Sequence, residues 1–210
     1  MAARRTRKDS GSGRAGRRAS AAVLCLVLLL ALPAAGCGLQ TDQANADLAK
    51  ANAHQQQAEA LMNRIKVLPD DWQRIFATPG ATPQEVAQAR DLINSRLADL
   101  TTLTTETKAW EKDVSAISKL NVDDKIKEYA KLKLASVKQW QDYGGLFLEP
   151  LVKAYGHLLD TIATGRPAAE QQQAASAITG QVSDSVQRLE ECLQAQKTAD
   201  DYFKNNKLGK

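Results

Sequence analysis

A long run of apolar and small residues, separated by steps of three and four positions, is the feature that most constrains this chain. Its members are Ala175, Ile178, Val182, Ser185, Leu189, Cys192, Gln196, Ala199 and Phe203. This spacing places all of them on one face of an α-helix, and a strict heptad keeps that face against a neighbouring helix. No stretch after residue 40 alternates with the period of two that a half-buried strand would show. The C-terminal part is therefore predicted to be one long helix packed against others.

Three earlier stretches show the same spacing. Apolar residues follow helical steps over 86–117 and 126–162, and more weakly over 42–67, where Gln55 interrupts the stripe. A short helical insert is expected around residues 71–76. Because the connections between the long stretches are short, neighbouring helices should run antiparallel. The sequence predicts an all-α fold, an up-down-up-down four-helix bundle of long helices with coiled-coil-like packing.

Local signals mark the ends of these helices. Thr82-Pro83-Gln84-Glu85 has the pattern of a capping box, with proline at the first helical position. Asp123 is the expected N-cap of the third helix. Gly165 is expected to end that helix, and Pro167 to begin the fourth.

Two unusual features lie close together in the third helix. Gly144-Gly145 and Pro150 weaken an α-helix, so we expect this helix to be kinked or broken near Gly144–Pro150. Around this point lie four aromatic residues, Trp140, Tyr143, Phe147 and Tyr155. A bend that spreads the bundle would open an apolar pocket between these rings. Alternatively, the rings fill the volume that the bend creates.

Hairpin geometry predicts one layer of the core. If the second and third helices turn near Asn121, Trp140 lies level with Leu103. If the third and fourth turn near Arg166, Trp140 lies level with Cys192. The three side chains should then meet in one buried layer, with a turn of slippage allowed at the paired glycines, and Cys192 is expected to be a buried core thiol.

The N-terminus has the layout of a secretory signal. Basic residues from Arg4 to Arg18 precede an apolar run from Ala21 to Ala35. Seven of the 28 basic residues but only one of the 24 acidic residues precede Cys37. The rest of the chain is therefore close to neutral, which argues against a nucleic-acid-binding surface.

The end of this leader, Ala34-Ala35-Gly36-Cys37, resembles the lipobox of bacterial lipoproteins, although Ala34 stands where leucine is usual. The resemblance implies that the chain is cut before Cys37 and that fatty acyl chains are attached to this cysteine. It divides the chain into a cleaved signal peptide (1–36), a lipidated tether (37–45) and a single helical-bundle domain (46–210).

The partner that this resemblance implies is a lipid bilayer, held through the acyl chains on Cys37. The body would lie outside the cytoplasmic membrane, on the cell membrane or, if the source has two membranes, on the outer one. Several acyl chains would make the anchoring stable. An uncleaved membrane anchor is the alternative, because residues 19–41 carry no charge.

Catalytic and metal-binding motifs give no candidate site. The sequence has no HExxH, Walker, GxSxG or CxxC pattern. Neither His54 nor His157 has the glutamate three positions earlier that di-iron bundles use, and His54 is expected to be solvated. The acidic pairs Asp70-Asp71 and Asp123-Asp124 precede helices. Their negative charges interact favourably there with the positive end of the helix dipole. We expect no catalytic residue, no metal and no cofactor.

Two functions remain. The first is a non-enzymatic cell-envelope lipoprotein, a tethered helical bundle that acts in structure or in contacts with an envelope protein, the cell wall or itself. The alternative is a tethered binding protein that holds a small apolar ligand near Trp140, Tyr143 and Phe147. A filled core with an exposed apolar stripe along one helix would favour the first function, and an apolar channel lined by the three rings would favour the second.

Overall fold

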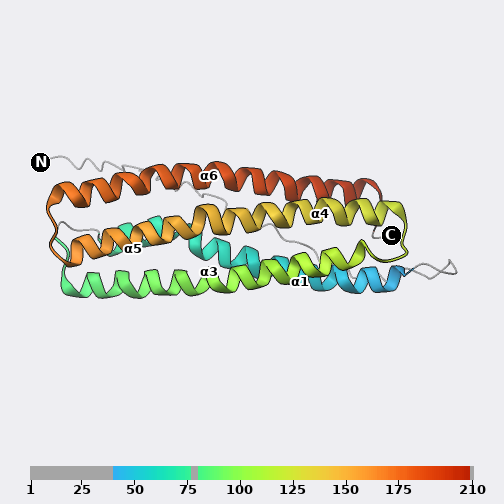
Figure 1. Ribbon diagram of the computed structural model, residues 1–210, viewed down its shortest axis with the longest axis horizontal. Coiled ribbons are helices and arrows are strands. Elements are labelled where there is room, and N and C mark those ends of the chain that lie inside the picture. Colours follow the sequence, from blue (N-terminus) through green and yellow to red (C-terminus); the bar gives the residue numbers. More distant parts are fainter. Residues whose placement is uncertain (1–39, 77–79, 209–210) are drawn as a thin grey trace, which may run out of the picture. The chain divides into compact units, whose positions relative to one another are not determined.

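The computed structural model describes residues 40–76 and 80–208, and every regular element within these ranges is helical. This confirms the predicted all-α class for the described residues. The predicted signal peptide and Cys37 lie outside them. The elements are α1 (Thr41–Lys66), α2 (Leu68–Ile75), α3 (Pro83–Ile117), α4 (Asp124–Asp142), the π-helix η1 (Tyr143–Leu148), α5 (Glu149–Ala163) and α6 (Ala168–Asn205), as Figure 1 shows.

The first helix begins slightly earlier than the proposed division of the chain implies. Residues 41–45, which we assigned to the tether, are the first residues of α1, and Ala44 among them is fully buried. The expected insert around 71–76 is α2, which follows α1 after Val67 alone.

The predicted helix starts have the expected caps. The Thr82 hydroxyl accepts a hydrogen bond from the Glu85 amide at 3.2 Å, and the Glu85 carboxylate accepts one from the Thr82 amide at 2.7 Å. Asp123 accepts from the Lys125 amide at 2.8 Å. These bonds satisfy amides that a helix leaves unpaired at its first turn.

Gly144, Gly145 and Pro150 change the helix type instead of breaking the helix. Of the kink or break expected here, the break does not occur, because the helical path continues from α4 through η1 into α5; the kink stays a prediction. Within it the Glu149 amide donates to the Gly144 carbonyl, five residues back. Pro150 lies in the first turn of α5. Single π turns of this kind occur as insertions inside α-helices.

Packing between the helices places α1 against α3, and both α4 and α5 against α3 and α6 (Figure 1). Along α4 and α6 the chain runs in opposite directions, since the Tyr129 and Phe203 rings lie 5.0 Å apart while the Cys192 thiol donates to the Gln139 carbonyl at 3.3 Å. Cys192 therefore lies next to the level of Trp140, as predicted, and it is fully buried.

The partner on α3 is shifted. A Cβ placed on Gly144 would lie 3.3 Å from the Leu103 side chain, so Leu103 faces Gly144, about one turn beyond Trp140. The glycine permits this close approach of η1 to α3.

Candidate functional site

The four aromatic residues near η1 do not form one cluster. Trp140 and Tyr143 are buried and lie with their ring centres 5.9 Å apart, edge to face. Phe147 is half-buried, and the guanidinium of Arg188 lies over its ring at 5.1 Å. Tyr155 is buried elsewhere. The four aromatic residues therefore lie in different surroundings.

Tyr155 belongs to an aromatic group at the α2 end of the core. Its ring lies 5.0 Å from that of Trp72, which in turn lies 4.8 Å from Phe76. Burial, with a smaller contribution from the Asp70 carboxylate, raises the pKa of Tyr155 to about 12. Because α2 directs Trp72 onto α5, these rings close the core at this level.

Trp140 and Tyr143 lie beside two polar groups of α6. The Tyr143 hydroxyl is 3.2 Å from the Ser185 hydroxyl, and burial raises its pKa. Burial also raises the pKa of the Cys192 thiol to about 12. A cysteine with so high a pKa carries almost no thiolate at neutral pH and is a poor nucleophile. The Cys192 thiol is therefore protonated at neutral pH and packs as a side chain of the core.

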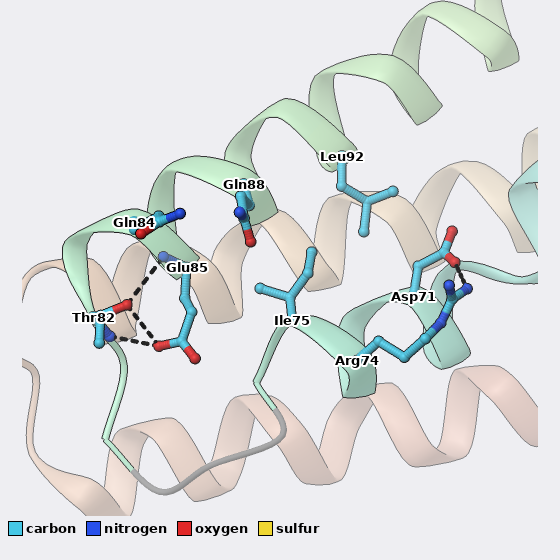
Figure 2. Close-up of a pocket in the computed structure, with 8 residues that line it drawn as sticks. All are labelled: Asp71, Arg74, Ile75, Thr82, Gln84, Glu85, Gln88 and Leu92. Carbon is cyan, nitrogen blue, oxygen red and sulfur yellow. Dashed lines mark hydrogen bonds and ion pairs between the residues drawn. The ribbon is translucent and has the colours of Figure 1, made fainter.

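A surface hollow lies apart from all four rings, between α2 and the start of α3 (Figure 2). Its apolar wall is formed by Ile75 and Leu92. Its charged groups already have partners, because Arg74 pairs with Asp71 and Glu85 is held in the capping box, whose hydrogen bonds to Thr82 lower the pKa of the Glu85 carboxyl. The hollow thus offers no unpaired charge to a ligand.

A second hollow lies between the end of α3 and the start of α4, with Val114, Ala130 and Leu134 among its lining residues. None of the four aromatic residues lines either hollow.

A buried polar network connects α1, α4 and α6, and sequence reasoning missed it. The Lys133 ammonium donates to the Gln55 side-chain oxygen at 2.8 Å and lies 3.4 Å from the Asp200 carboxylate. The Glu59 carboxylate accepts from Gln55 at 2.8 Å and from Gln196 at 2.9 Å. Only 5% of the Lys133 side chain is exposed. One signal was available, because Lys133 lies at helical spacing between Ala130 and Val137 within the apolar stripe.

His54 joins α1 to α3, so the expectation of a solvated surface histidine is only half right. Its side chain is 32% exposed, but Nδ1 lies 2.7 Å from a Glu106 oxygen and Nε2 lies 3.7 Å from an Asp113 oxygen. The two acidic residues are seven positions apart on α3, so they face α1 from the same side.

A second charged group joins α1, α2 and α3. Arg96 donates to Asp71 at 2.9 Å and to Asp99 at 3.3 Å, and Asp99 also accepts from Arg64 at 2.7 Å. These pairs position the short α2 against its neighbours. Among the described residues, no group of three or more His, Cys, Asp or Glu side chains has an arrangement that could hold a metal ion.

Among residues 40–76 and 80–208, the large apolar side chains that remain exposed lie on three elements. Leu146 of η1 is 66% exposed, Val186 and Leu193 of α6 are 55% and 51% exposed, and Leu97 of α3 is 36% exposed. Val186 and Leu193 are seven residues apart, so they share one side of α6. This pair is the most prominent apolar feature on the long helices.

Comparison with known proteins adds no family. No protein-family model, curated protein or solved structure matches this chain. In the part of the chain that the structure describes, no helix combines the length and apolar character needed to cross a bilayer.

Proposed function

We propose that this chain is a non-enzymatic lipoprotein of the cell envelope, anchored through Cys37, whose helical body binds another protein. In this proposal the long helices form an up-down-up-down four-helix bundle that holds the binding surface at the end of a lipid tether. The localisation rests on the leader, whose basic, apolar and Ala34-Ala35-Gly36-Cys37 parts occur in the order of a lipoprotein signal.

The bundle topology is supported by the contacts between helices. Neighbouring pairs are α1 with α3, α3 with α4 and α5, and α4 and α5 with α6. Opposite chain directions are supported for α4 and α6 by the contacts of Tyr129 with Phe203 and of Gln139 with Cys192.

Protein binding is favoured over an apolar small-molecule ligand by the packing of the rings. Trp140 and Tyr143 are 3% and 1% exposed, and each touches other core side chains. A ligand between them would have to displace part of a close-packed interior. The buried Lys133 ammonium is also engaged, by the Gln55 side-chain oxygen and the Asp200 carboxylate.

The observation that carries the proposal is the exposed apolar pair on α6. Val186 and Leu193 remain more than half exposed in the middle of a 38-residue helix. Exposed apolar side chains that recur at heptad spacing are typical of a helix that packs against a further element. We therefore place the protein-binding surface on this side of α6.

A photo-crosslinking experiment in cells tests the binding surface. The full chain carries a photoreactive amino acid at Val186 or Leu193, with Leu97 of α3 as the matched exposed position. Irradiation should give a crosslinked protein species from both α6 positions and none from Leu97. No crosslinked species from either α6 position would overturn the proposal.

A separate experiment tests the anchor. Replacement of Cys37 by Ala should abolish fatty-acid labelling and leave the leader uncut, whereas the unchanged protein should begin at a lipid-modified Cys37 by intact mass. A mature chain that begins elsewhere and carries no lipid would show that the anchoring is wrong.

A further inference from the structure

The exposed side of α6 carries a second apolar stripe beside its buried one. The stripe consists of Val182, Val186, Leu189 and Leu193, separated by steps of four, three and four. Val182 and Leu189 are half-buried, whereas Val186 and Leu193 are exposed. We call these four residues the outer stripe. Their spacing is that of a coiled-coil seam, which a single further helix would cover.

The described helices of the chain use a different side of α6. The residues of α6 that face α4 and η1 include Ser185 and Cys192, which contact Tyr143 and Gln139. Val186 and Leu193 each follow one of these residues by one position, which turns them about 100° around the helix. Val182 and Leu189 pack partly against the core, whereas Val186 and Leu193 lie outside the internal interface.

Charges beside the outer stripe restrict what can cover it. Glu190 and Lys197 are both exposed and lie seven residues apart on this side of α6. The Lys197 side chain is 65% exposed and pairs within the helix with Asp201, while Glu190 has no ion pair among the described residues. Glu190 and Lys197 thus lie on either side of Leu193, which is roughly midway between them, and Asp201 lies beside Lys197.

We propose that a second copy of this chain covers the outer stripe, with the two α6 helices antiparallel and a two-fold axis beside Leu193. This inference rests on the proposed function, since it names the partner that binds α6. In this arrangement Leu193 meets the second copy's Leu193. Glu190 lies level with the second copy's Lys197, and the symmetry repeats that pair. This direction and register place opposite charges on both sides of the apolar contact.

Other pairings of the same two helices are opposed by charge. A parallel pair in register places Glu190 against Glu190 and Lys197 against Lys197. An antiparallel pair with its axis at Glu190 brings two carboxylates together. Like charges at facing positions are unfavourable and exclude wrong registers, whereas the axis at Leu193 gives opposite charges on both sides of an apolar contact.

Cysteine crosslinking of the full chain in membranes tests the axis. Leu193→Cys places two thiols at the two-fold axis, so mild oxidation should give a disulfide-linked dimer above the background of the unsubstituted chain. Leu146→Cys is the matched control, since Leu146 is at least as exposed but lies on η1. Equal dimer yields from the two variants would overturn the proposal.

Charge reversal tests the direction of the pairing. In the Leu193→Cys background, Glu190→Lys alone and Lys197→Glu alone should each lower the dimer yield roughly fivefold, because each creates two like-charge contacts. The double reversal restores opposite charges and should return the yield to its starting level. All three changes are on exposed positions, and the recovery in the double variant also shows that the fold is intact.

Two results separate this inference from the proposed function. If photo-crosslinks from Leu193 reach a different protein and the charge reversals leave the dimer yield unchanged, the second copy is wrong while protein binding by α6 stands. If neither α6 position gives any crosslinked species, both proposals fail.

Discussion

The α1–α3 and α4–α6 interfaces bury their central residues equally well but with different side chains. In α1 the fully buried positions include Ala44, Ala51 and Ala58, which are spaced by seven. At the α4–α6 interface, α6 also buries small residues spaced by seven, Ser185, Cys192 and Ala199, but α4 contributes a large side chain, Trp140. Small residues at every seventh position let two helices approach closely, but each buries little apolar area. The comparison teaches that complete burial does not mean equal stabilisation.

Because α1 buries little apolar area, polar contacts contribute to fixing its position against the other helices. His54 faces Glu106 on α3, and Gln55 and Glu59 reach Lys133 and Gln196 on the other two helices. Buried polar groups that must pair with one another can select a single register. We infer that α1 is placed mainly by these pairs, whereas α4 is held to the small buried residues of α6 by large side chains of its own such as Trp140.

The largest effect is expected at the aromatic interface. Trp140→Ala should lower the free energy of unfolding by about 3–5 kcal/mol, because it removes a large side chain from a close-packed core. Denaturant unfolding followed by circular dichroism measures the change. His157→Ala on exposed α5 surface is the control and should be nearly neutral. A loss below about 1 kcal/mol for Trp140→Ala would mean that this layer is loosely packed.

Enlarging a seam alanine tests the close approach of α1 to α3. Ala51→Leu should cost about 2 kcal/mol of unfolding free energy, since the fully buried site has no room for a larger side chain. Asn52→Leu, at the next and exposed position, is the matched control and should change stability little. Equal effects of the two substitutions would contradict close packing at Ala51.

The buried polar network around Lys133 predicts that two substitutions have non-additive effects on the free energy of unfolding. Lys133→Met should cost about 2 kcal/mol because it leaves the Gln55 amide oxygen buried without its donor. Adding Gln55→Leu removes that oxygen as well, so the double variant should regain most of the loss. Asp200 is 36% exposed and can be solvated. Additive losses in denaturant unfolding would show that the two side chains do not act together.

Alkaline pH should destabilise the protein through Cys192 and Tyr155, two buried side chains whose pKa values are raised in the folded state. The folded-state pKa of Cys192 is raised from an ordinary value near 9 to about 12, so the folded state holds this proton where the unfolded state has lost it. The contribution is complete below pH 9 and is lost as the pH rises toward 12. Tyr155 acts in the same sense from about pH 10.

This pH effect is measured as the slope of the unfolding free energy against pH. Unfolding free energies of the unchanged protein should fall between pH 9 and 11, and Cys192→Ala should reduce the slope by at most about 1.4 kcal/mol per pH unit. Native Cys192 should also react slowly with thiol reagents and rapidly after unfolding. An unaltered slope in the alanine variant would assign the pH dependence to other groups.

Helix positions could be predicted because their signals are local. The capping box at Thr82 and the heptad over 175–203 depend only on neighbouring residues, and the structure follows both. The grouping of Tyr155 with Trp72 could not be predicted, because it depends on how α2 turns onto α5. Lys133 was detectable in principle, since a charge inside an apolar stripe requires a buried partner.

The form of the third helix could not be predicted from its own residues alone. Gly144-Gly145 followed by Pro150 is compatible with a kink, a break or a change of helix type. Gly144 also lies close to Leu103, which belongs to a separate helix, and such a tertiary contact cannot be predicted from the local residues.

The π-helix affects whether the buried residues before and after it face the same direction. Buried positions occur at Lys133, Val137, Trp140, Gly144, Leu148, Leu151, Tyr155 and Leu158. Steps of four and three alternate along this series except at η1, where two steps of four follow each other. In an unbroken α-helix those two steps would rotate the stripe by about 80°. Because the wider π turn rotates less per residue, it compensates for the additional residue, and the segments before and after it keep a common inward direction.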